Sequence, residues 1–317
     1  MPTDPAPSAR LPANPLRCSA VTRAAGVDPV GTAGSYDGYL LVEWPLPWPR
    51  DIGAVEELAP LAAPLAAAGI RLQALVPPDG TSGERRLVLY RQPPGELFAG
   101  YERDERVVPV DRVVDGALDL VAAIGAGPPP TPTDDVTADV LVCTHGQRDV
   151  CCGSMGTALA AELMADGAPF GPGVRTWRTS HTGGHRFAPT AVVLPQGTVW
   201  AHLDADALRR IVGRQGPLDD LLPRYRGCAG VGPPMAQAVE REAFARHGWA
   251  WLDHHRRGRL LDDGRVRLDA VAPDGSVQAW QATVEVGRTV PVPECGRPLD
   301  EAKKSESEWR VTGVGPV

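Results

Sequence analysis

The chain has 317 residues and a hydrophobic content of 43%, which suffices for a buried core and allows two domains of ordinary size. Its 32 basic and 39 acidic residues give a formal charge of −7, so nucleic-acid binding over a basic surface is excluded as the main function. No apolar run is long enough to cross a membrane, so no membrane span is expected. The six cysteines are unevenly spaced and the proline-rich N-terminus lacks the apolar core of a secretory signal, which predicts a cytoplasmic protein with reduced thiols.

The first half of the chain alternates predicted strands and helices. We expect residues 1–15 to be a flexible lead-in and residues 16–126 to form an N-terminal α/β domain. Its predicted strands are 39–44, 71–76, 85–91 and 105–110, and its helical regions are 54–69, interrupted by prolines, and 113–125. The proline-rich stretch "GPPPTPTDD" predicts a linker at residues 127–135.

Residues 136–230 predict a second α/β domain. Strands are expected at 138–143, 174–180, 190–195 and 198–203, and helices at 153–167 and 204–214. The order strand, helix, strand, strand, strand, helix is that of a thioredoxin-like unit. Two loops rich in metal-binding residues would then follow neighbouring strands at one edge of the sheet, where sites in α/β proteins usually lie.

Two further features concern the organisation of the whole chain. "YLLVEWPLPWPRD" parallels "DVLVCTHGQRD", with Glu43 where the second segment has Cys143. This parallel indicates either a degenerate internal repeat or two α/β domains without special kinship. Residues 231–317 predict a small C-terminal α+β extension, with a helix followed by a β-hairpin around "PDG" and a charged end that packs through Trp309 at most.

The segments "CTHGQRDVCCG" and "SHTGGHRF" carry the candidate chemistry. Cys143 and Cys152 are nine positions apart, Cys151 is an alternative to Cys152, and His181 and His185 are four apart. Two thiolates and two imidazoles can bind one zinc ion or a [2Fe-2S] cluster. The wide cysteine spacing favours a cluster, because zinc knuckles hold their cysteines closer together.

Gly183 and Gly184 separate the two histidines and can adopt positive φ. We therefore expect the backbone to approach a cluster closely there and to offer N–H donors. His145 is interpreted as structural or solvent-facing. The remaining cysteines and histidines are interpreted as ordinary buried or surface residues, namely Cys18, Cys228, Cys295, His202, His247, His254 and His255.

The two segments together resemble the sucrase/ferredoxin-like family, whose signature is C-x8-C followed by H-x-G-G-H. The resemblance is sharpest over residues 139–195 and extends more loosely to Cys18 and to "VPVPECGRP" near the C-terminus. It implies a thioredoxin-like ferredoxin with a [2Fe-2S] cluster bound by Cys143, Cys152, His181 and His185, and it selects Cys152 over Cys151. It warrants no sugar chemistry, since no placed pair of carboxylates can be singled out.

A ligand set of this kind implies a redox function. Two thiolates leave an oxidised cluster near neutral, so its potential should exceed that of all-cysteine ferredoxins, as in Rieske centres. Arg148 and Arg186 raise the potential further if they lie close. The second nitrogen of each imidazole can couple reduction to proton uptake.

No dinucleotide fingerprint or P-loop is present, so a partner protein or a small molecule must donate and accept the electrons. A redox carrier is favoured over a stand-alone enzyme. The alternatives are a structural zinc protein with the same ligands and a thiol oxidoreductase that uses Cys151 and Cys152.

Overall fold

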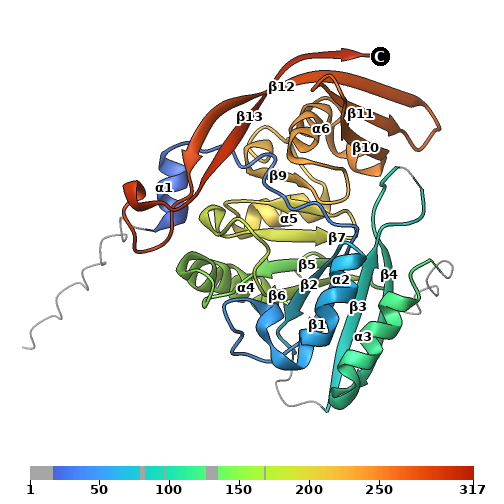
Figure 1. The fold of residues 1–317 in the computed structure, drawn as a ribbon, viewed down its shortest axis with the longest axis vertical. Coiled ribbons are helices and arrows are strands. Elements are labelled where there is room, and N and C mark those ends of the chain that lie inside the picture. The colour runs from blue at the N-terminus through green and yellow to red at the C-terminus, as the bar shows by residue number, and fades with distance from the viewer. Residues whose placement is uncertain (1–16, 79–82, 96, 126–134, 168) are drawn as a thin grey trace, which may run out of the picture.

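The computed structural model describes residues 17–78, 83–95, 97–125, 135–167 and 169–317. The predicted lead-in, residues 1–15, lies outside the described residues, as does all of the predicted linker except Asp135. The fold of these described residues is mixed α/β, as predicted, with one nine-stranded sheet and one four-stranded sheet; Figure 1 shows their arrangement.

The larger sheet contains the strands of both predicted α/β domains. Its order is β4-β3-β1-β2-β6-β5-β7-β8-β9. The strands are β1 (Gly38–Glu43), β2 (Ile70–Leu75), β3 (Glu84–Arg91), β4 (Glu102–Pro109), β5 (Ala138–Cys143), β6 (Val174–Thr179), β7 (Ala191–Leu194), β8 (Thr198–Trp200) and β9 (Tyr225–Cys228). All but β9 lie within three residues of a predicted strand at each end.

The two halves of this sheet repeat one pattern of strand directions. In the first half, β1 is parallel to β2 and antiparallel to β3, which pairs antiparallel with β4. In the second half, β5 is parallel to β6 and antiparallel to β7, which pairs antiparallel with β8. The halves join where β2 meets β6, with Leu75 opposite Thr179.

The described residues form six α-helices and a series of short helices in addition to the strands. The α-helices are α1 (Cys18–Ala24), α2 (Ala62–Ala67), α3 (Val113–Ala122), α4 (Thr157–Ala165), α5 (Ala205–Gly213) and α6 (Pro234–His247). A π-helical turn, η4 (Cys152–Gly156), leads directly into α4. The 3-10 turns are η1 (Ile52–Ala54), η2 (Glu56–Leu61), η3 (Val110–Arg112), η5 (His185–Phe187), η6 (Leu222–Arg224), η7 (Gly248–Asp253) and η8 (Leu299–Glu301). No helix in the described part of the chain is both long and apolar enough to span a membrane.

Successive side chains of β1 point alternately into two buried cores, one on each face of the sheet. Leu40 and Val42 pack in a core with α2 and α3, whereas Tyr39 and Leu41 face the larger core of the molecule. Every residue of β1 is buried. A strand that is covered on both faces must be apolar throughout, which is why "YLLV" reads as a continuous hydrophobic run.

A buried carboxylate ties the two halves together. Asp139 on β5 accepts hydrogen bonds from the Tyr90 hydroxyl on β3 at 2.5 Å, and from Arg175 Nε and Trp177 Nε1 on β6, both at 2.6 Å. A buried charge is stable only when paired and hydrogen-bonded, and these donors meet that requirement.

The C-terminal extension forms the second sheet, in the order β10-β11-β12-β13. Its strands are β10 (His255–Leu260), β11 (Val266–Val271), β12 (Val277–Pro291) and β13 (Ser305–Pro316), and α6 contacts both this sheet and β9. The predicted hairpin is confirmed as β11 and β12. The expectation that the charged end packs through Trp309 at most is wrong, because that end pairs along β12 as β13.

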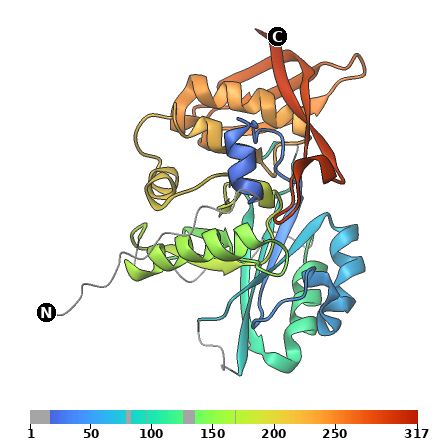
Figure 2. The same cartoon turned by 90° about the vertical axis from the view of Figure 1, so that its left-hand side faces the viewer.

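The two ends of the described chain meet. Figures 1 and 2 both place α1 beside the pair of strands β12 and β13. The Cys18 backbone N–H donates to Cys295 Sγ at 3.4 Å. The Trp309 indole fills the space that a side chain at Gly31 would need. These contacts bring the N-terminal helix and the loop after β12 to the same edge as the predicted site.

Candidate metal centre

The cysteine segment is shaped by its position at the carboxyl end of β5. Cys143 is the last residue of that strand, and helical backbone begins at Val150. Asp149 precedes this helical turn and its Oδ1 accepts the Cys151 backbone N–H at 2.8 Å, as an N-cap does. A Cβ at Gly156 would lie 1.9 Å from the Cys143 carbonyl oxygen, so glycine there lets η4 approach the end of β5.

Three of the four predicted ligands are gathered. Ligand atoms of Cys143, Cys152 and His181 all lie within 4.8 Å of one another, and both cysteines are fully buried. We call these three residues the Cys143 group. The ring centroid of His185 lies 6.1 Å from that of His181. The fourth predicted ligand is therefore adjacent to the group and not within it.

His181 and His185 each keep a ring nitrogen that can bind a metal. His185 Nε2 lies 3.2 Å from the Pro293 carbonyl, and donation of its proton there leaves Nδ1 with a free lone pair. His181 Nδ1 is buried and has no hydrogen-bond partner within the described ranges. A buried nitrogen without a partner is unusual unless an ion or water completes it.

His145 holds the backbone of His181 in place. Its Nδ1 accepts the His181 backbone N–H at 3.2 Å, and its Nε2 lies 2.9 Å from the Pro49 carbonyl. The ring is buried edge-on against Trp48, with centroids 5.5 Å apart, and burial lowers its pKa. The structural interpretation of His145 fits this position.

Gly183 and Gly184 have φ values of +86° and +65°. The positive φ expected of them is observed, but their close neighbour, Arg226, is not among the predicted site residues. The guanidinium of buried Arg226 lies 2.6 Å from where a Cβ of Gly184 would be, and its Nη1 donates to the Gly183 carbonyl at 3.0 Å. Buried Arg226 thus supports the loop between His181 and His185.

The pKa values of the Cys143 and Cys152 thiols are shifted in opposite directions. A hydrogen bond from Cys152, and then the nearby His181, hold the pKa of the Cys143 thiol well below its usual range. The same bond, together with burial, raises the pKa of Cys152. Burial also lowers the pKa of His185, which favours its neutral ring. Thiolates and neutral imidazoles are the forms that bind metals.

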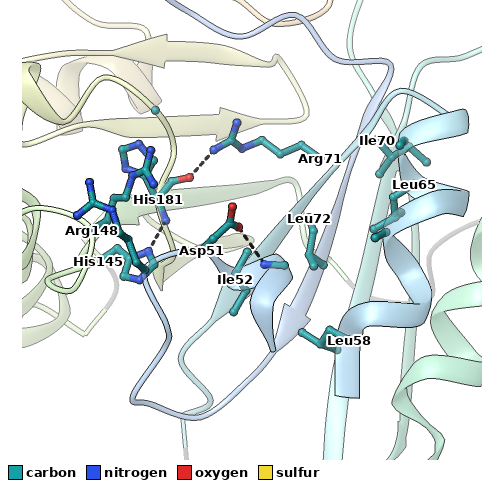
Figure 3. Close-up of a pocket in the computed structure, with 15 residues that line it drawn as sticks. Asp51, Ile52, Leu58, Leu65, Ile70, Arg71, Leu72, His145, Arg148 and His181 are labelled. Atoms are coloured by element: carbon teal, nitrogen blue, oxygen red, sulfur yellow. Dashed lines mark hydrogen bonds between the residues drawn. The ribbon is translucent and has the colours of Figure 1, made fainter. Parts of the chain in front are cut away.

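The two predicted arginines lie in different surroundings. Arg186 is buried, forms an ion pair with Glu306 of β13 at 2.6 Å and lies over the Phe187 ring at 4.3 Å. Arg148 lines an open pocket. This pocket has a volume of about 520 Å³. In Figure 3, Arg148, His145 and His181 form one wall of the pocket, and Arg71 reaches across to the His181 carbonyl.

A second group of ligand-type residues lies beside the first. Ligand atoms of Cys18, Asp149, Cys151 and Cys295 are all within 4.8 Å of one another. We call these four the Cys151 group. Cys18, Cys143, Cys151 and Cys152 belong to one buried cluster, with Cys295 packed against it. The interpretation of Cys18 and Cys295 as ordinary buried thiols missed this grouping, for which the loose resemblance at both chain ends was the only signal.

A mixed α/β sheet with buried cysteines after β5 and half-buried histidines after β6 defines a protein with candidate metal-binding sites. The sequence model of the sucrase/ferredoxin-like family matches residues 29–227, more than half of the chain, and the chain belongs to that family. A yeast protein from Meyerozyma guilliermondii, altered inheritance of mitochondria protein 32, is similar, with 38% identity over 71 residues. That match covers 21% of this chain and only 25% of the relative. No solved structure matches the chain.

Proposed function

We propose that the chain is an electron-transfer protein that binds a [2Fe-2S] cluster through Cys143, Cys152, His181 and His185. The observation that carries the proposal is the convergence of Cys143, Cys152 and His181 within 4.8 Å, with the His185 ring beside them. Two sulfur and two nitrogen donors are a ligand set of [2Fe-2S] centres.

When bound, such a cluster accepts and donates one electron, at a potential raised by its neutral ligands. The protein residues prepare the site for it. The hydrogen bond from Cys152 lowers the pKa of the Cys143 thiol, which favours its thiolate, and Pro293 orients the His185 ring through Nε2. His145 fixes the backbone of His181, and Arg226 holds the loop between the histidines.

The pocket beside His181 is the proposed point of electron exchange. It brings solvent to the histidine side of the group, whereas both cysteines are buried. Arg50 and Arg148 on its wall favour a partner protein or small molecule with an anionic group at the contact. Imidazole ligands in general keep a second ring nitrogen, through which proton uptake can accompany reduction.

Each half of the large sheet is proposed to be a thioredoxin-like unit, with residues 16–126 as a degenerate copy and residues 136–230 as the ferredoxin domain. The repeated strand directions support this interpretation. Glu43 ends β1 as Cys143 ends β5. The Oε2 atom of Glu43 accepts a hydrogen bond from the Arg86 backbone N–H at 2.9 Å. An ion-paired glutamate at this position fits a copy that has lost the site.

Zinc at the same ligands is the second candidate. The compactness of the Cys143 group favours it, because donor atoms within 4.8 Å also suit a single ion. A thiol oxidoreductase using Cys151 with Cys152 gains no support, because the two sulfurs lie in different groups.

The test is an anaerobic purification with iron and zinc assays and visible spectra before and after dithionite. We expect about two irons per chain and a red-brown colour that bleaches on reduction. His181→Ala should lose most of the iron, and His255→Ala, at an exposed position of β10, should keep it. A colourless protein that holds zinc at these ligands, despite ample iron and cluster-assembly support, would overturn the redox function.

A further inference from the structure

The Cys151 group brings together three segments that are distant in the chain. Cys18 begins α1, Asp149 and Cys151 flank the start of the turn before η4, and Cys295 lies in the loop after β12. Cys18, Asp149 and Cys151 are buried, and Cys295 is half-buried. Three thiols and one carboxylate supply four donors, the coordination number of a structural zinc site.

The sulfur–oxygen separations within the group equal those around a single tetrahedral ion, and the sulfur–sulfur separations are shorter by less than 1 Å. Zinc bonds of about 2.3 Å to sulfur and about 2.0 Å to oxygen place ligand sulfurs about 3.8 Å apart, and sulfur about 3.5 Å from oxygen. Cys295 Sγ lies 3.1 Å from Cys151 Sγ and 3.4 Å from Cys18 Sγ. Asp149 Oδ1 lies 3.5 Å from Cys295 Sγ and 3.6 Å from Cys18 Sγ.

The surroundings already orient the donors. The Cys18 backbone N–H donates to Cys295 Sγ at 3.4 Å, and the Cys151 backbone N–H donates to Asp149 Oδ1 at 2.8 Å. Such hydrogen bonds fix the ligands of metal sites. A disulfide would use two of the three thiols and would leave the third thiol and the carboxylate buried together without explanation.

We propose that Cys18, Cys151, Cys295 and Asp149 form a second metal site, which binds one structural zinc ion. On binding, three zinc–sulfur bonds and one zinc–oxygen bond form, and each thiol that is protonated releases its proton to solvent. No electron is transferred, so the site needs no oxidant or reductant. It is separate from the Cys143 group and does not depend on what that group binds.

This zinc would hold the two ends of the chain against the first site. Cys295 is two residues from Pro293, whose carbonyl lies 3.2 Å from His185 Nε2. Cys18 Sγ lies 3.7 Å from the His185 carbonyl. The ion therefore fixes the loop that orients His185, a consequence that rests on the proposed function because it treats His185 as a ligand.

The experiment measures zinc and iron on the same full-length samples after addition of Zn²⁺ and removal of the excess. Wild type, Cys295→Ser and Cys228→Ser are compared. Cys228 is a matched control because it is a buried cysteine outside both groups, with its thiol bonded to the Gln196 carbonyl at 3.2 Å. We expect Cys295→Ser to lose one zinc equivalent and Cys228→Ser to lose none.

The iron and zinc contents distinguish the redox proposal from the proposal of a second zinc site. If wild type holds no iron and two zincs, the redox function fails, while a drop to one zinc in Cys295→Ser still supports the second site. Equal zinc in wild type and Cys295→Ser overturns the second site, and so does a disulfide among the three thiols in peptides mapped without reductant.

A measurement on wild type alone covers the case in which Cys295→Ser does not fold. The half-buried Cys295 should react with iodoacetamide only after a chelator removes zinc, with one zinc released as this thiol becomes reactive. Equal reactivity of Cys295 with and without Zn²⁺ would overturn the proposal.

Discussion

Cys151 and Cys152 are neighbours in the chain, yet their Sγ atoms lie in different groups, one with Cys18 and Cys295 and the other with Cys143 and His181. Helical backbone separates them, because successive helical residues point about 100° apart. A vicinal cysteine pair that looks redundant in the sequence thus contributes one thiol to each of two groups of possible metal ligands.

The two neighbours should therefore behave differently when each is replaced by serine. Cys152→Ser should lose the iron and the visible absorption, because it removes a ligand from the Cys143 group. Cys151→Ser should keep most of the iron and lose one zinc. Metal analysis and visible spectra of both variants check this, and each variant is the control for the other. Identical metal losses would contradict the division into two sites.

Replacing a histidine by cysteine should lower the reduction potential. In His181→Cys a thiolate takes the place of a neutral imidazole, which makes reduction harder by on the order of 100 mV or more. The wild-type potential should rise as pH falls, by at most about 59 mV per pH unit for one proton per electron. Redox titrations followed by the visible spectrum at several pH values measure both effects. A pH-independent, strongly negative wild-type potential would refute the mixed ligation.

Gly156→Ala should destabilise the protein and disturb the Cys143 group. The added Cβ would lie 1.9 Å from the Cys143 carbonyl oxygen, so backbone must shift at a cost of about 1–3 kcal/mol. Gly315→Ala is the control, because a Cβ there meets nothing within 4 Å. Urea unfolding and metal content measure the effect. If the two variants are equally stable and hold equal metal, the close approach is not required.

His202 should make the fold sensitive to acid. Burial lowers its pKa to about 4, and the ring packs edge-on against Phe187. The folded state then binds fewer protons than the unfolded state below about pH 6.5, so the free energy of unfolding falls as pH drops from there to about 4, by up to about 3 kcal/mol.

The variant His202→Asn removes this titration and suits the positive φ of 51° at the position, which asparagine tolerates. Urea unfolding of wild type and variant between neutral pH and about pH 4 measures the difference in slope. Parallel pH profiles would show that His202 does not contribute.

The sequence predicted most strands of the large sheet and the residues of the Cys143 group. Continuous apolar runs such as "ADVLVC" are local signals, and the fold buries them on both faces. The nine-residue spacing of Cys143 and Cys152 and the HTGGH loop are also local. Their placement after the parallel neighbours β5 and β6 follows from the strand order.

The tertiary structure decided the rest. The joining of the halves into one sheet at β2 and β6 leaves no local pattern, nor does the burial of Asp139 among donors from two other strands. The charged segment that became β13 is a strand because β12 offers it an edge to pair with. The Cys151 group joins thiols from opposite ends of the chain, Cys18 and Cys295. No short-range periodicity encodes such a meeting, because it depends on the path of the whole chain through both sheets.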